Sequence, residues 1–207
     1  MTPGESARVL ALWCPDWPAI AAAAAADLPP TEPVAVTLGN RVVACSATAR
    51  SEGVRRGLRK REAQGRCPGL HVFLVDVGRD ARLFEPVAAA IDAVAPGVEV
   101  LRPGLLVLAA RGVSRYFGSE PAAAERLIDE ASAAGVECQV GIADELSTAV
   151  IAARRAALVP RGRVPSSSPR SRWPSSRRSR AWRRRGARTW SICCTGWVCG
   201  PSATSRR

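Results

Sequence analysis

The last 47 residues of this 207-residue chain contain no aspartate or glutamate, although thirteen arginines lie there. All eighteen acidic residues lie in 1–160, together with seventeen basic ones. The first part is therefore nearly neutral, and the tail supplies the net charge of +12. A net positive charge of this size would normally indicate a nucleic-acid partner, but here the charge comes from one anomalous segment. Because the two compositions are unlike those of a single folded unit, we interpret 1–160 and 161–207 separately.

Zinc-binding cysteine patterns and long apolar runs are also missing, and only one histidine is present. The single histidine, His71, has no metal-ligand cluster around it, which argues against a His-ligated catalytic metal. No run of eighteen consecutive apolar residues is present, so no membrane span is expected. The four cysteines of 1–160 have no zinc-site spacing, and we expect them to be buried in a reducing cytosol. These are Cys14, Cys45, Cys67 and Cys138.

Within 1–160, β-rich apolar runs alternate with helical patterns. The runs predict strands at 8–13, 33–38, 41–46, 71–75, 98–101, 105–109 and 137–143. The helical patterns predict helices at 18–27, within 47–66, and at 79–95, 121–134 and 146–158. Gly39-Asn40 and Pro103-Gly104 predict hairpin turns. Asp16 is expected to cap the first helix, and Gly135 to follow the end of the helix that Pro121 begins.

This order predicts an α+β fold. With 27–71 set aside, the elements run strand, helix, strand, strand, helix, strand, which is the ferredoxin-like βαββαβ arrangement. We therefore predict a ferredoxin-like domain built from 1–26 and 72–160. Residues 27–71 would form a small α/β subdomain inserted at its edge. Residues 161–207 would be a disordered basic tail.

Several short segments resemble one known family. Segment 43–57 (VACSATARSEGVRRG), with Arg61-Glu62-Ala63 and Cys67-Pro68 after it, resembles the fingers of Y-family (translesion) DNA polymerases. Segment 140–143 (VGIA), before a helix, resembles a strand of their palm. Segment 12–17 (LWCPDW) resembles the opening of the ImuB-type subgroup. The resemblance implies that the ferredoxin-like domain is a palm and 27–71 the fingers.

Active members of that family need carboxylates for two metal ions, because Mg²⁺ prefers hard oxygen ligands. The resemblance places the first pair at Leu12 and Cys14 and the second at Gly104 and Leu105, none of which is a carboxylate. Asp16 lies two residues too far along. We therefore predict no catalytic residue, no metal site and no cofactor, and Mg²⁺ only if unorthodox ligands replace the missing ones.

Basic residues of the fingers are the remaining candidates for binding nucleotide or DNA phosphates. The resemblance implies that Arg50 contacts an incoming triphosphate, although a capping or solvated arginine fits the pattern as well. Trp17 could screen the sugar or be a core aromatic. The basic run could neutralise phosphates with strongly salt-dependent binding, or form a solvated helix face. Its members are Arg55, Arg56, Arg59, Lys60 and Arg61.

The tail permits two interpretations. Arginines interleaved with Trp173, Trp182, Trp190 and Trp197 could form an arm that binds nucleic acid by charge and stacking. Alternatively, a frameshift near Pro160 produced it. GC-rich codons for 189–205, read one base earlier, encode DLVDLLHRLGVRTIGDF, which resembles the helix-hairpin-helix of the family's thumb. We favour the frameshift, and thus expect a truncated product; sequencing the gene around codon 160 tests this.

The resemblance implies a damage-tolerance protein of the cytoplasm, associated with the nucleoid. We expect a non-catalytic scaffold for translesion synthesis that binds damaged DNA weakly. Its implied partners are a catalytic translesion polymerase and a sliding clamp, although a truncated product would lack the regions that bind them. The alternatives are an active polymerase with unorthodox metal ligands and a nonfunctional pseudogene product.

Overall fold

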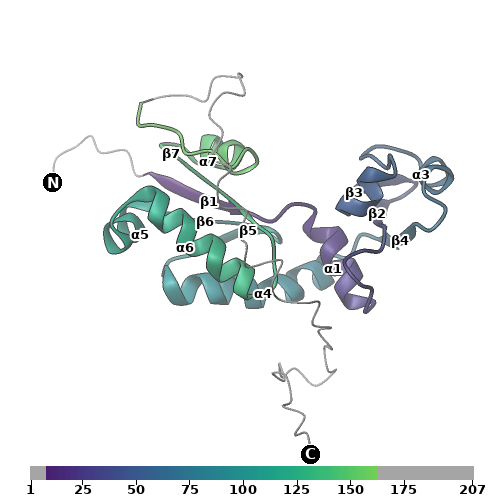
Figure 1. Ribbon diagram of the computed structural model, residues 1–207, viewed down its shortest axis with the longest axis horizontal. Helices are drawn as coiled ribbons and strands as arrows, with labels where there is room; N and C mark the ends of the chain where they lie inside the picture. Colours follow the sequence, from purple (N-terminus) through teal and green to yellow (C-terminus); the bar gives the residue numbers. More distant parts are fainter. Residues whose placement is uncertain (1–7, 163–207) are drawn as a thin grey trace, which may run out of the picture.

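The computed structural model describes residues 8–162, which form an α+β fold with two sheets (Figure 1). The larger sheet contains β1 (Val9–Trp13), β5 (Glu99–Arg102), β6 (Leu105–Ala109) and β7 (Gln139–Ala143). Their order is β5-β6-β1-β7, and every neighbouring pair is antiparallel. This is the predicted ferredoxin-like arrangement.

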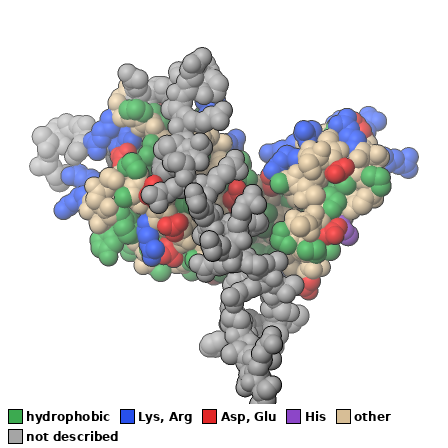
Figure 2. Space-filling view, in the orientation of Figure 1, with side chains coloured by type: hydrophobic (Ala, Val, Ile, Leu, Met, Phe, Trp, Pro, Cys, Tyr) green, Lys and Arg blue, Asp and Glu red, His purple; other side chains and the backbone are tan. Residues whose placement is uncertain are grey.

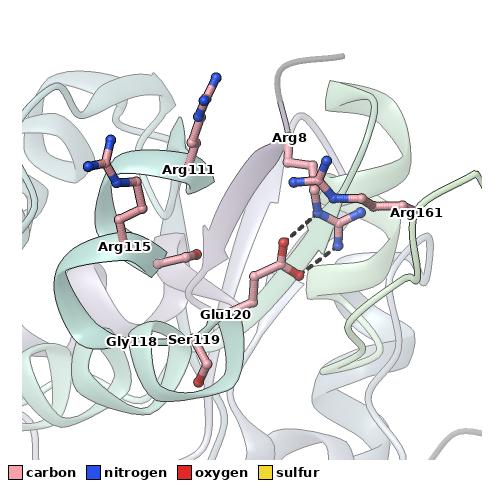
Figure 3. A pocket seen from close by; sticks show the side chains of 8 residues that line it. Arg8, Arg111, Arg115, Gly118, Ser119, Glu120 and Arg161 are labelled. Carbon is pink, nitrogen blue, oxygen red and sulfur yellow. Dashed lines mark hydrogen bonds and ion pairs between the residues drawn. The ribbon is translucent and has the colours of Figure 1, made fainter. Parts of the chain in front are cut away.

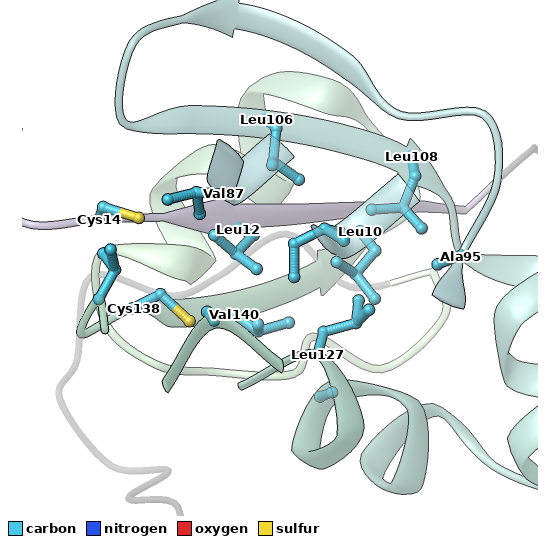
Figure 4. Close-up of a cluster of buried hydrophobic side chains, with 14 of the residues drawn as sticks. Leu10, Leu12, Cys14, Val87, Ala95, Leu106, Leu108, Leu127, Cys138 and Val140 are labelled. Carbon is cyan, nitrogen blue, oxygen red and sulfur yellow. The ribbon is translucent and has the colours of Figure 1, made fainter. Parts of the chain in front are cut away.

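Alternating side chains of the larger sheet separate into two packed faces. Helices α4 (Val77–Val94) and α6 (Glu120–Ala133) cover one face, while α7 (Leu146–Ala153) lies on the other (Figure 1). The first face contributes Leu10 and Leu12 to the main core, which Figure 4 shows from close by. On the second face α7 packs so closely that a Cβ added at Gly141 would lie 2.0 Å from the backbone nitrogen of Ala153.

The smaller sheet belongs to the inserted segment. Strands β2 (Val34–Leu38) and β3 (Arg41–Cys45) form the predicted hairpin around Gly39, whose φ of 59° suits glycine. Strand β4 (His71–Leu74) pairs in parallel with β2, so all of β4 lies in this sheet, although the sequence-based boundary at 71 includes only its first residue. Two short helices, α2 (Ala47–Ser51) and α3 (Lys60–Arg66), complete the unit. Helix α1 (Trp17–Ala25) contacts both β2 and α4 and so connects the two sheets.

Capping residues set several of the predicted helix ends. The Ser119 side chain accepts a hydrogen bond from the backbone of Ala122, Pro121 lies in the first turn of α6, and Gly135 follows its end with a φ of 83°. Asp76 caps α4 in the same way as Ser119 caps α6.

Two helix predictions need correction. Helix α5 (Ala110–Phe117) follows β6 directly and is absent from the sequence-based prediction. Helix α7 ends at Ala153 rather than near 158, because the chain turns at Ala156 and Leu158 then bridges to Ile142 of β7. The predicted disorder of the tail falls outside the described residues beyond 162. None of the helices in 8–162 is long and apolar enough to cross a membrane.

Candidate nucleic-acid interface

The end of β1 lies beside the turn of the β5–β6 hairpin. The resemblance predicts this, because active family members carry their metal-binding carboxylates on these two segments. Trp13 pairs with Leu105, and the Cys14 amide donates a 2.9 Å hydrogen bond to the Gly104 carbonyl. The backbones of all four predicted positions are therefore neighbours.

Their side chains, however, do not converge on one face. Leu12 and Cys14 point into the main core under the helices, where they are 0% and 1% exposed (Figure 4). Burial raises the pKa of the Cys14 thiol to about 12. Leu105 lies directly opposite Trp13, so these two side chains share the face that α7 covers. The β1 side chain that faces Leu105 is thus Trp13, a position that sequence reasoning missed.

Gly104 has no room for any side chain. An added Cβ would lie 2.4 Å from the Cβ of Trp17, and the residue has a φ of 81°. Trp17 itself is only 3% exposed, donates from its indole nitrogen to the Asp80 carbonyl at 2.9 Å, and makes an edge contact with Phe84 at 5.0 Å. Of the two interpretations of Trp17, the structure therefore supports the core aromatic.

Asp16 begins α1, but it does not act as the predicted side-chain cap. Its φ of 53° places it in the left-handed region, and its carboxylate makes no capping hydrogen bond. The carboxylate instead forms an ion pair with Arg50, whose guanidinium also donates to the Cys45 carbonyl at 3.0 Å. Arg50 therefore connects α2 to the start of α1, rather than projecting alone into solvent.

Three arginines from distant parts of the chain interact electrostatically, and one of them lies beside Trp13. The Arg154 guanidinium, at the end of α7, lies 5.8 Å from the centre of the Trp13 ring. Partial desolvation, and then the positive charges of Arg154 and Arg56, lower the pKa of Arg102. In the described part of the chain, neither Arg56 nor Arg102 has an acidic partner within salt-bridge distance. We call Trp13, Arg56, Arg102 and Arg154 the cationic cluster.

The other members of the basic run are exposed, but the structure gives them different roles. Arg55 donates to the backbone carbonyls of Arg50 and Val54, and so stabilises the turn after α2. Arg59 precedes α3, while Lys60 and Arg61 lie in its first turn. Basic side chains gather along the top of the smaller lobe and on its flank that faces the larger one (Figure 2).

No group of three or more histidine, cysteine, aspartate or glutamate side chains that could hold a metal occurs within 8–162. The cysteines of the described region, Cys14, Cys45, Cys67 and Cys138, are all buried free thiols, as predicted. At the strand ends, the Leu12 side chain and the Cys14 thiol thus lie in the main core, while the Trp13 indole lies on the opposite face of the sheet.

Comparison with known proteins identifies the family. The model of the impB/mucB/samB family matches residues 17–154, about two thirds of the chain. The chain belongs to this family of Y-family polymerase homologues. No curated protein sequence matches it.

Solved structures of Y-family polymerases share the fold. DinB from Sulfolobus solfataricus has a TM-score of 0.60 at 18% identity, covering 75% of this chain and 48% of that one. A ternary complex of Dbh gives 0.58 at 16% identity, with the same two coverages. An insertion ternary complex of Dbh DNA polymerase gives 0.60 at 17% identity, covering 74% of this chain and 48% of that one. The chain thus spans about half the length of these relatives.

Proposed function

We propose that this impB/mucB/samB-family chain is a non-catalytic, DNA-binding protein of damage tolerance, of the ImuB type. One observation carries the proposal: Trp13 and Leu105 meet at the strand ends to which the resemblance assigns the metal ligands, and an arginine cluster there has no acidic partner among the described residues. Side chains of this kind can stack on bases and neutralise phosphates, but they offer no hard oxygen ligands. A clamp and a catalytic polymerase would be its partners in translesion synthesis.

The cationic cluster supports binding to a polyanion for an electrostatic reason. Arg154 and Arg56 both repel Arg102, so that their charges, after desolvation, lower the pKa of Arg102. A nucleic-acid phosphate placed among them would relieve that repulsion and release condensed counterions. Arg154, which lies over the Trp13 ring, adds a planar guanidinium group on which an unpaired base could stack.

Primer extension tests the catalytic half of the proposal. With primed template, all four deoxynucleotides and either Mg²⁺ or Mn²⁺, the purified chain should extend no primer. Extension above that of a mock purification would overturn the non-catalytic assignment and favour an active polymerase that uses other ligands. If extension occurs, Asp16→Ala checks whether it depends on the Asp16 carboxylate, which lies two residues beyond Cys14 and pairs with Arg50.

Salt-dependent DNA binding tests the other half. Anisotropy of a labelled single strand gives the slope of log K against log[salt], which should become shallower by about 0.7 for each phosphate that a variant no longer neutralises. Arg56→Gln, Arg102→Gln and Arg154→Gln should each show this change. Arg126→Gln, an exposed helix position paired with Glu130, is the matched control. Identical slopes for all four variants would refute the cluster as the interface, and absent binding by a folded wild type would favour a nonfunctional product.

A further inference from the structure

A second basic site lies at the opposite end of β1. It is an open hollow of about 360 Å³ between the start of β1, helix α5 and the start of α6 (Figure 3). Four arginines from three segments line it, two of them on α5, together with one glutamate. They are Arg8, Arg111, Arg115, Arg161 and Glu120. Since Trp13 ends β1 and Arg8 precedes it, this hollow is separate from the cationic cluster.

Buried ion pairs hold one wall of the hollow in place. Arg8 is 4% exposed, and its guanidinium contacts the Glu120 carboxylate at 2.6 and 2.8 Å. It also contacts Asp144 at 2.8 Å and donates to the Val159 carbonyl at 2.7 Å. This wall is therefore preorganised, because Arg8 cannot rotate without breaking contacts with three segments.

The lining of the hollow carries more positive than negative charge. The lining holds four guanidinium groups and the Glu120 carboxylate, and Asp144 pairs with Arg8 from beside it. Helix α6 also begins here, and the positive end of its dipole adds to that potential. The Ser114 hydroxyl, which lines the same hollow, is buried without a hydrogen-bond partner among the described residues.

We propose that this hollow binds a phosphomonoester dianion, and we call it the phosphate pocket. Because guanidinium groups outnumber carboxylates in the lining, it suits a group that carries about two negative charges above its second pKa near 6. Guanidinium forks also match the geometry of phosphate oxygens. The group could be free phosphate or the 5′ phosphate of a DNA end, since both present the same oxygens.

Calorimetric titration of the full chain with inorganic phosphate tests the pocket. At constant ionic strength, phosphate should bind at pH 7.5 and weaken as the pH falls below about 6, where it becomes a monoanion. Arg115→Gln should weaken binding about tenfold, because it removes one charged hydrogen-bond donor from an exposed position. Arg115→Lys should restore part of the loss. Arg82→Gln, an exposed arginine on α4, is the control.

Two oligonucleotides distinguish the sources of the phosphate. A strand with a 5′ phosphate should bind more tightly than the same strand with a 5′ hydroxyl if a DNA end is the ligand, and Arg115→Gln should abolish the difference. Equal binding of the two strands, with phosphate still bound, assigns the pocket to a free phosphate compound. Either result supports the pocket.

The proposal is overturned if phosphate binds no better than chloride, or if Arg115→Gln and Arg82→Gln have equal affinities. It is separable from the function proposed above. Arg102→Gln should leave phosphate binding intact, and Arg115→Gln should leave the single-strand salt slope intact. If both variants reduced both readouts alike, one shared surface would replace the separate pocket.

Discussion

Replacing Gly104 with alanine should remove much of the chain's stability, for two reasons that can be separated. The residue has a φ of 81°, and an alanine held in the left-handed region costs about 1–2 kcal/mol. Its new Cβ would lie 2.4 Å from the Trp17 Cβ and 2.9 Å from Cγ. Because those atoms sit close to the α1 backbone, they cannot swing away, and overpacking of this kind costs about 1–3 kcal/mol. The total of about 2–5 kcal/mol compares with a typical stability of about 5–15 kcal/mol.

Substitutions at two other glycines separate the steric contribution to this loss of stability from the backbone contribution. Gly39 has a φ of 59° with nothing within 4 Å of an added Cβ, so Gly39→Ala should lose only the backbone contribution of about 1–2 kcal/mol. Gly112 lies within α5 in open space and without a positive φ, so Gly112→Ala should gain about 0.5–1 kcal/mol. Urea unfolding followed by far-UV circular dichroism gives all three free energies. If Gly104→Ala lost no more than Gly39→Ala, the contact with Trp17 would not constrain the turn. The same contact excludes restoring a carboxylate at position 104 by a single substitution.

Two further predictions concern titration. The Gly162 amide and Arg8 lower the pKa of Asp144, so its stabilising effect should be complete above the ordinary carboxyl pKa of about 4 and disappear as the pH falls through the lowered value. Asp144→Asn should flatten that acid dependence in urea unfolding, and an unchanged pH profile would contradict it. Burial raises the pKa of the Cys14 and Cys138 thiols, so both should resist iodoacetamide at about pH 8 until urea unfolds the chain. Peptide mass mapping checks this, and rapid labelling of either in the native state would contradict their burial.

The fold is largely predictable from the sequence because its strands carry their own turn signals. Gly39 and Gly104 each mark a hairpin, and the intervening apolar runs are strands. Helix α5 escapes prediction because it follows β6 without a side-chain cap and contains Gly112, so no local pattern marks its start. The end of α7 is misplaced because the alanine-rich run continues past Ala153. Only the tertiary hydrogen bond from the Val159 amide to Ile142 explains why the helix stops.

The candidate site is less predictable, for reasons of geometry. In a strand, an offset of one residue moves a side chain to the opposite face. Sequence spacing therefore identifies strand ends that do meet, but it does not show that Trp13, rather than Leu12 or Cys14, shares a face with Leu105. The gathering of Arg56, Arg102 and Arg154 depends on three separate elements, which no local pattern relates. Arg50 is recognisable from its motif, but its pairing with Asp16 emerges only when α1 and α2 meet.

The contacts of Arg8 link the start of β1 to the end of the described region. Its guanidinium donates a hydrogen bond to the carbonyl of Val159 and another to the carboxylate of Asp144. The Asp144 carboxylate in turn accepts a hydrogen bond from the amide of Gly162. Arg8, which directly precedes β1, thereby fixes the position of the last residues that the structure describes. A following domain would take its starting orientation from a single side chain that precedes the very first strand.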